Sequence, residues 1–313
     1  MISVCTRAQL EAVMRPAEVI RVVEEGFASY SRGETVIPAP AHLGFEKPEG
    51  ECHIKYGYRK GDSTFTVKVA TGFPENASKG MPTGNGVVLV LSSENGELLA
   101  ILQDEGFLTD IRTAAAGAVA AKLLAPRDPQ CIGILGAGVQ AKLQLEYLRD
   151  IVPTRRVVLW ARSRERAEAC RVDGFQIRIA KSSAEVAESC RLIVTTTSSR
   201  KWLLNASDIR SGTHITAMGA DGGGKQELAP GLFSLAAIRA VDSRTQCAQF
   251  GDSSYAIKQG LIRCEELVEL GDLLNGKCSG RQNDSQITIA DLTGVAIQDI
   301  QVANLALTAL GIR

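Results

Sequence analysis

The stretch "GILGAGVQA" (133–141) decides the fold. Gly136, Gly138 and Ala141 form a G-x-G-x-x-A pattern between an apolar strand-like segment, "CIGIL", and the helical pattern "VQAKLQLEYLRD". The first glycine permits a tight turn, the second lets the backbone approach a pyrophosphate, and the alanine lets helix and strand pack closely. A plain glycine turn is the alternative, but the strand before it and the helix after it favour a dinucleotide-binding turn.

Strand and helix patterns continue to alternate after this turn. The predicted strands are "RVVLW", "FQIRI", "RLIVTTT", "HITAMG", "AIRAVD" and "SQITIAD", and a last helix is expected at about 294–311. This alternation predicts an α/β fold with a doubly wound parallel (Rossmann) sheet. Before residue 126 the pattern differs: two helices open the chain and four strand-like segments follow, with a hairpin signal at Asn95-Gly96. That part predicts an antiparallel sheet.

The composition restricts the class of protein. The 313 residues are enough for two domains, and 35 basic side chains balance 35 acidic ones, so nothing favours nucleic acid as a partner. We see neither a membrane span nor a signal peptide. Eight cysteines without a C-x-x-C pair suggest reduced thiols in the cytoplasm. His42, His53 and His214 lie far apart in the sequence, so we expect no metal site.

The end of the second predicted strand bears on cofactor choice. An NAD site usually carries Asp or Glu there to accept from the ribose 2′-hydroxyl, but this chain has Ala161. Arg162, Ser163 and Arg166 surround it, and a 2′-phosphate favours cations and hydroxyls over a carboxylate. A solvated basic turn is the alternative. We therefore expect NADP(H), with NAD(H) still possible.

The loop "GADGGGKQ" (219–226) raises a different possibility, because it contains most of a phosphate-binding P-loop. A P-loop needs Ser or Thr after its lysine, whereas Gln226 follows Lys225 and Pro230 comes soon after, so we exclude nucleoside triphosphates. Asp221 ends the predicted strand "HITAMG", where doubly wound sheets bind ligands. Its carboxylate could exchange a proton with a substrate nitrogen, although a structural turn aspartate is the alternative.

Two cations stand in unusual positions. Lys68 interrupts the apolar strand "TFTVKVA", and Arg112 begins the alanine-rich segment "TDIRTAAAG". An exposed strand face and a helix surface would explain them without a function. A small carboxylate substrate would favour such cations, especially the forked donors of arginine.

The sequence resembles the ornithine cyclodeaminase/mu-crystallin family over nearly its whole length. The similarity is carried by "VKVATGFPEN", "MPTGNGVVLV", "LTDIRTAAAGAVAAK", "ILGAGVQA", "HITAMGADGGGKQEL" and "GRQNDSQITIADLTG". The resemblance implies a Rossmann NAD(P)-binding domain over 126–291. It also implies an α+β substrate-binding and dimerisation domain formed by 1–125 plus 292–313, and hence a homodimer.

The resemblance also assigns roles to particular residues. Lys68 and Arg112 would hold the substrate carboxylate, Asp221 would donate and accept the proton, and Thr293 would lie near substrate or nicotinamide. Residues expected at the cofactor, beyond those of the basic turn, are Thr83, Arg112, Thr113, Gly136, Gly138, Val139, Gln140, Thr196, Met218, Gly219 and Lys225. The chain departs from the family at Ala39, where an arginine is expected, and Lys55 or His53 could replace it.

Three functions remain open from the sequence. The first is an NAD(P)H-dependent reductase of small imino acids, such as pyrroline-2-carboxylate or piperideine-2-carboxylate. The second is an ornithine cyclodeaminase, which converts ornithine to proline and ammonia with bound NAD. The third is a non-enzymatic binding protein similar to mu-crystallin, against which the joint presence of Lys68, Arg112 and Asp221 argues.

Overall fold

The computed structural model describes residues 2–312 of the chain, which form two compact units. The first comprises the residues up to Arg112 together with those from Val295 onward, and the second comprises Thr113–Gly294. The boundary falls inside helix α3 (Phe107–Leu124). Among residues 2–312, no helix combines the length and apolar character that a bilayer crossing requires.

The second unit contains the predicted doubly wound parallel sheet. Within the described residues its eight strands lie in the order β10-β9-β8-β11-β13-β17-β15-β16, and all neighbours are parallel. The direction of winding reverses between β8 and β11, so the switch point lies beside the glycine turn. The strands are β8 (Ile132–Leu135), β9 (Arg156–Trp160), β10 (Gln176–Ile179), β11 (Leu192–Thr195), β13 (His214–Ala217), β15 (Ile238–Val241), β16 (Val268–Glu269) and β17 (Thr288–Asp291).

Buried central strands explain why this half of the sequence shows apolar runs rather than alternation. Every residue of β8, β11, β13 and β17 is buried, as expected for parallel strands covered on both faces. The connecting elements are α4 (Val139–Leu148), α5 (Arg164–Ala169), α6 (Ser183–Ser189), β12 (Arg200–Leu204), η2 (Ala206–Asp208), β14 (Gln226–Leu228), α7 (Gly231–Leu235), α8 (Arg244–Phe250), α9 (Ser253–Lys258), η3 (Cys264–Glu266) and α10 (Leu270–Leu274).

The first unit contains the predicted antiparallel sheet. Its strands follow the order β1-β7-β6-β5-β4-β2, with β3 also paired to β4. Among the described strands of this sheet, β1 and β7 are parallel and all other neighbours are antiparallel. The expected hairpin at Asn95-Gly96 joins β6 and β7. The elements are β1 (Ser3–Thr6), α1 (Arg7–Val13), α2 (Pro16–Ser31), β2 (Thr35–Val36), β3 (Ala41–Glu46), β4 (Glu49–Arg59), β5 (Thr64–Gly72), η1 (Pro74–Lys79), β6 (Gly84–Ser92) and β7 (Leu98–Gln103).

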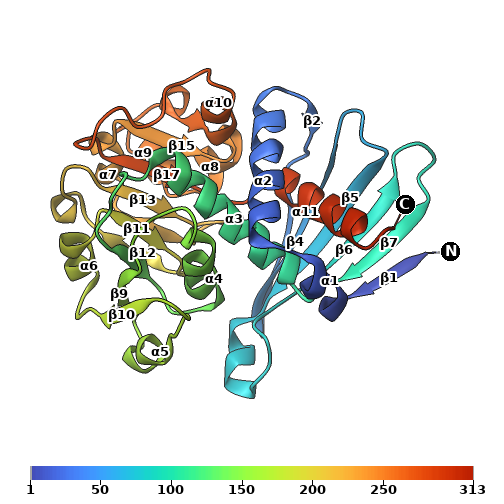
Figure 1. Ribbon diagram of the computed structural model, residues 1–313, viewed down its shortest axis with the longest axis horizontal. Coiled ribbons are helices and arrows are strands. Elements are labelled where there is room, and N and C mark those ends of the chain that lie inside the picture. The colour runs from blue at the N-terminus through green and yellow to red at the C-terminus, as the bar shows by residue number, and fades with distance from the viewer. Residues whose placement is uncertain (1, 313) are drawn as a thin grey trace. The chain divides into compact units, whose positions relative to one another are not determined.

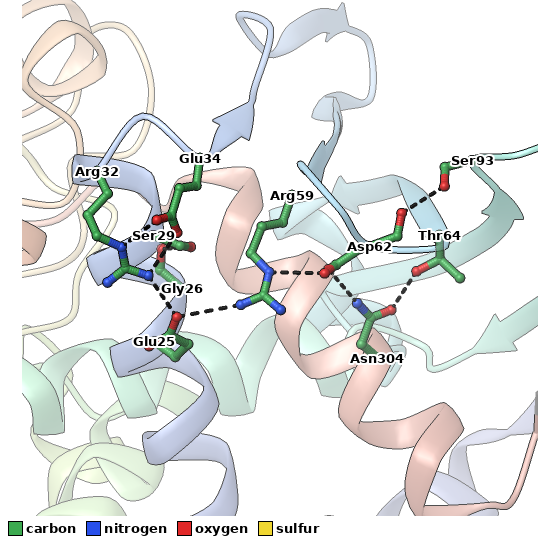
Figure 2. A network of polar contacts seen from close by, with 10 residues as sticks. All are labelled: Glu25, Gly26, Ser29, Arg32, Glu34, Arg59, Asp62, Thr64, Ser93 and Asn304. Carbon is green, nitrogen blue, oxygen red and sulfur yellow. Dashed lines mark hydrogen bonds and ion pairs between the residues drawn. The ribbon is translucent and has the colours of Figure 1, made fainter.

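The last helix, α11 (Ala296–Ala309), belongs to this first unit and lies beside α2, as the red and blue helices in Figure 1 show. Most of α11 is buried, so apolar packing is its main attachment. Figure 2 shows a polar network at its far end. Asn304 accepts a hydrogen bond from Thr64 Oγ1 (2.9 Å) and donates to Asp62 (3.3 Å), and Arg59 joins Asp62 to Glu25 of α2. These partly exposed contacts fix the position of α11 over β4 and β5.

Candidate active site

The turn between β8 and α4 has the geometry of a dinucleotide-binding turn. Gly136 has φ +127°, and a Cβ there would lie 2.4 Å from Thr196 Oγ1, so the position requires glycine. Gly138 caps α4, and a Cβ built on it would meet no atom within 4 Å. Val139, the first residue of the helix, is 61% exposed. The backbone N–H groups at this helix end are therefore accessible and fit a pyrophosphate.

The loops that follow β8, β11 and β13 are tied together at the carboxyl ends of these strands. Thr196 N donates to Leu135 O (2.8 Å), and Met218 N donates to Thr195 O (3.2 Å). Thr196 and Met218, both expected at the cofactor, therefore lie at the same edge of the sheet as the glycine turn. In doubly wound sheets, ligands bind in the crevice at this edge.

Gln144 is a buried residue of this region that the sequence did not single out. Its Nε2 donates to Thr113 O (3.2 Å) and Gln140 Oε1 (3.4 Å) and lies 2.8 Å from Met218 Sδ. Three residues expected at the cofactor thus converge on one amide. A glutamine in a helical pattern is usually exposed, so nothing in the sequence distinguished it.

Glu227 was also missed, and it holds the Asp221 loop in place. This buried carboxylate accepts from Thr195 Oγ1 (2.5 Å), from Thr197 N (2.6 Å) and Oγ1 (2.7 Å), and from Gly219 N (2.8 Å). Burial raises the pKa of Glu227, although these hydrogen bonds oppose the shift. Glu227 therefore joins the loop after β11 to the loop after β13.

Asp221 lies in the loop that follows β13, at the carboxyl edge of the sheet. Its side chain is 44% exposed and accepts a hydrogen bond from Lys225 Nζ at 2.7 Å. To exchange a proton with a substrate nitrogen, the carboxylate would have to share or give up this lysine. The catalytic role of Asp221 and the cofactor role of Lys225 stay predictions.

The turn after β9 is basic, as the sequence indicated. Ser163 caps α5 and its Oγ accepts from Arg166 N at 3.3 Å, while Arg162 and Arg166 are exposed. Ala161 occupies the position next to the strand end and offers no carboxylate to a ribose. The expectation of NADP(H) rests on this turn and stays a prediction.

In the first unit, Lys68 and Arg112 come together around a carboxylate from α11. Lys68 Nζ donates to Asp299 Oδ1 at 2.8 Å, and Arg112 Nε lies 3.3 Å from the same oxygen. Arg112 Nη1 also donates to Gln298 Oε1 at 2.9 Å. Lys68, on β5, is 2% exposed and Arg112 is 7% exposed, so the alternatives of an exposed strand face and a helix surface are wrong.

Lys55 adds a third cation to this cluster. It lies directly opposite Lys68 in the β4–β5 pair and is 8% exposed. Its burial agrees with the suggestion that it replaces the missing arginine. Asp299 and Gln298 were not anticipated, but a lone charged residue in the largely apolar segment "GVAIQDIQVANLAL" was a usable signal.

Burial and close charges shift the pKa values of the side chains in the cluster. Burial lowers the pKa of Lys68 to about 7, although Asp299 opposes the shift. Burial alone would raise the pKa of Asp299, but Lys68 and Arg112 bring it below its usual value. Asp104 is a further carboxyl near Lys68, and burial raises its pKa. The cluster therefore brings the buried side chains of Lys55, Lys68 and Arg112 together with the carboxylate of Asp299.

The cluster also has unused hydrogen-bonding capacity. Within residues 2–312, Arg112 Nε, Gln298 Nε2 and Asp299 Oδ2 are buried and make no hydrogen bond. These atoms offer donors and an acceptor together. A ligand that carries both a carboxylate and a nitrogen would satisfy them.

The remaining expected residues occupy varied positions. Thr83 is exposed before β6, and Ala39 is exposed before β3. Thr293 is buried, with its hydroxyl donating to Asp242 (3.2 Å) and accepting from Gln246 Nε2 (3.0 Å). These contacts give Thr293 a structural role, and its expected ligand contact stays a prediction.

His53 lies on the same face of β4 as Lys55, but its neighbours are His42 and Glu51. The antiparallel β3–β4 pair places His42 directly opposite His53. The expectation of no metal site was based on sequence separation, which ignores cross-strand pairing, and it stays a prediction. Their ligand atoms and one from Glu51 lie within 4.8 Å of one another.

The parallel sheet, the open glycine turn and the buried cation cluster define a nicotinamide-dependent oxidoreductase of the Rossmann class. The model of the ornithine cyclodeaminase/mu-crystallin family matches residues 1–308, and the chain belongs to that family.

Three similar proteins show the range of activities around this chain. An uncharacterized cyclodeaminase of Sinorhizobium fredii is 38% identical, with 92% of this chain and 89% of that protein covered. A structure of the Thermococcus litoralis Δ1-pyrroline-2-carboxylate reductase, in complex with NADH and L-proline, has a TM-score of 0.93 at 29% identity and 99% coverage of both chains. An archaeal alanine dehydrogenase dimer with bound NAD has a TM-score of 0.90 at 32% identity, covering 98% of this chain and 95% of its own.

Proposed function

We propose that the protein reduces small imino acids, of the ketimine or cyclic-imine class, with NADPH preferred to NADH. The observation that carries this proposal is the buried cluster of Lys55, Lys68 and Arg112 around Asp299. The cationic side chains of Lys68 and Arg112 suit a substrate carboxylate, and the open donors and acceptor of Arg112, Gln298 and Asp299 suit a group that bears nitrogen next to that carboxylate. The similar reductase in complex with NADH and L-proline supports this substrate class.

The protein's own residues would bind, orient and exchange protons. Gly136, Gly138 and the start of α4 would hold the pyrophosphate, and a bound nicotinamide would supply the hydride. Arg112, with its forked donors, would orient the substrate carboxylate, and Lys68 would add charge. Asp221 would deliver the proton to the nitrogen once it parts from Lys225.

Cofactor preference, assembly and location are also proposals. Arg162, Ser163 and Arg166 support NADPH, although the similar structures contain NADH or NAD. The alanine dehydrogenase dimer supports a homodimer. The eight free thiols of the described chain support a cytoplasmic protein.

A cyclodeaminase is the second candidate, favoured by the relative that is 38% identical.

The two functions differ in their use of cofactor. The test is a panel of Δ1-pyrroline-2-carboxylate, Δ1-piperideine-2-carboxylate, 2-oxo acids with amines, and L-ornithine, each with NADPH, NADH and NAD⁺. A reductase consumes one NAD(P)H per imine, whereas a cyclodeaminase releases ammonia from ornithine without net change in absorbance at 340 nm. Failure of every substrate would leave a binding protein.

A further inference from the structure

Two thiols meet in the second unit, far along the chain from each other. Cys131 immediately precedes β8, and Cys190 ends α6 just before β11. Because β8 and β11 are parallel neighbours with Ile132 opposite Leu192, the two cysteines lie at the amino ends of adjoining strands. Their Sγ atoms are 2.9 Å apart. The cofactor turn lies at the other, carboxyl end of β8.

The two thiols differ in access and in charge. Cys190 is fully buried, whereas Cys131 is half-buried and lines an open hollow of about 530 Å³. Arg156 and Arg178 line the same hollow. The hydrogen bond with Cys190 is the main cause that lowers the pKa of Cys131 to about 7, and nearby arginines add to it, while burial opposes the shift. Cys131 is therefore the thiol that is both reachable and readily ionised.

We propose that Cys131 and Cys190 form a reversible thiol–disulfide pair that hydrogen peroxide oxidises. The Cys131 thiolate attacks a peroxide oxygen, which gives the sulfenic acid and, after protonation of the leaving hydroxide, one water. The Cys190 thiol then attacks the Cys131 sulfur, and a second water leaves as the disulfide forms. A dithiol reductant returns two electrons and two protons. Closing 2.9 Å to a bond of about 2.05 Å needs less than ~1 Å of movement.

The test uses the full-length protein, hydrogen peroxide and peptide mapping. Trypsin releases Cys131 in residues 128–142 and Cys190 in 182–191, so the disulfide appears as one cross-linked peptide pair, 2 Da lighter than the two thiol peptides together. We expect a loss of two thiols per chain, located at this pair, which dithiothreitol reverses. Cys190→Ser should accumulate a dimedone-reactive sulfenic acid at Cys131. Cys278→Ser, which removes an exposed cysteine elsewhere, should leave the cross-link unchanged.

Two results would overturn the proposal. One is that Cys131 and Cys190 stay reduced while Cys278 is oxidised. The other is that Cys131 is oxidised in the unaltered protein only to sulfinic acid, without the cross-link. Neither readout depends on catalytic activity, so the test is independent of the function proposed above.

A separate observation concerns the β3–β4 hairpin. His53 Nε2 lies 3.3 Å and His42 Nε2 lies 3.9 Å from the same oxygen, Glu51 Oε2. A tetrahedral metal with bonds of about 2.0–2.1 Å places its ligand atoms roughly 3.3–3.4 Å apart. His53 Nε2 is buried and makes no hydrogen bond within the described residues, so in the neutral imidazole this nitrogen is available to a metal ion.

We infer that His42, Glu51 and His53 form a site for a divalent transition metal of the zinc type. Two imidazoles and one carboxylate match the ligands that such ions prefer, and they leave a position open for water or another ligand. His42 has a 53% exposed side chain, so it can adjust while His53, at 17%, stays fixed. A bound ion would also neutralise Glu51.

Cobalt(II) is the probe, because its visible absorption strengthens at tetrahedral sites. Protein purified without a histidine tag should bind one equivalent with a band near ~600 nm, and equimolar Zn²⁺ should displace it. His42→Asn, which alters an exposed side chain, and Glu51→Gln should each abolish the band. Glu46→Gln makes the same charge change at an exposed position of this hairpin and should retain it. Absence of the band, or its persistence in His42→Asn/His53→Asn, would overturn the inference.

Discussion

Replacing Asp299 with asparagine tests how the cation cluster works. The change keeps the shape of the side chain but removes the negative charge 2.8 Å from Lys68 Nζ. Burial already lowers the pKa of Lys68 to about 7, and Asp299 is the main group opposing that shift. Without Asp299, Lys68 should lose its proton at lower pH. The substrate carboxylate would then meet a neutral amine.

The expected loss of kcat/KM follows from the effect of one nearby charge on the pKa of Lys68. An opposite charge at this range typically shifts a pKa by about 1–3 units. At pH 7 the charged fraction of Lys68 would fall from about half to between roughly 10% and 0.1%, so kcat/KM for an imino acid should drop about 5- to 500-fold. Saturating substrate should recover most of kcat, because binding favours the charged lysine, and the loss should therefore appear mainly in KM.

The assay is kcat/KM for the best imine of the panel, measured from pH 5 to pH 9. In the unaltered enzyme it should fall as pH rises through about 7, because the free lysine deprotonates. Asp299→Asn should move this fall to lower pH. Asp62→Asn, the same chemical change in the polar network at the other end of α11, should leave the profile unchanged. If Asp299 only competes for the cations, its removal would instead lower KM, and our reasoning would be refuted.

Four further predictions address other parts of the molecule. Asp221→Asn should lower kcat by ~10²–10⁴-fold with little change in NADPH affinity, and a near-normal kcat would make this aspartate a turn residue. Arg112→Lys should raise KM for the imino acid more than it weakens cofactor binding, because lysine lacks the forked donors. Equal effects on both would contradict a specific contact between Arg112 and the substrate carboxylate. The turn at Arg162 predicts a higher kcat/KM with NADPH than with NADH, and the opposite ranking would contradict it. Burial raises the pKa of Asp291 to about 6, so the folded protein binds more protons than the unfolded chain between about pH 4 and 6. The free energy of unfolding should therefore fall as pH rises through that window. Asp291→Asn should reduce this fall when unfolding is measured by urea titration at several pH values, and an unchanged pH dependence would contradict the assignment.

The sequence predicted the second unit more completely than the first. Gly136 and Gly138 act through their own backbone geometry, and the strand and helix beside them are local patterns, so the turn can be recognised from a dozen residues. Gln144 and Glu227 could not be recognised, because their importance depends on which loops meet at the carboxyl edge of the sheet. Their partners include Thr113, 31 residues away from Gln144, and Thr195, 32 residues away from Glu227.

The cation cluster shows the same limit in a sharper form. The sequence showed that Lys68 interrupts an apolar strand but left open whether its side chain lies on an exposed face. Burial of that face depends on α11, which returns from the end of the chain and contributes Asp299, 231 residues away from Lys68. A buried lysine requires a counter-charge, so the two positions have meaning only together. An isolated acid in a largely apolar helix and an isolated lysine in an apolar strand are each ambiguous alone, but their simultaneous presence in one chain is what a buried ion pair requires.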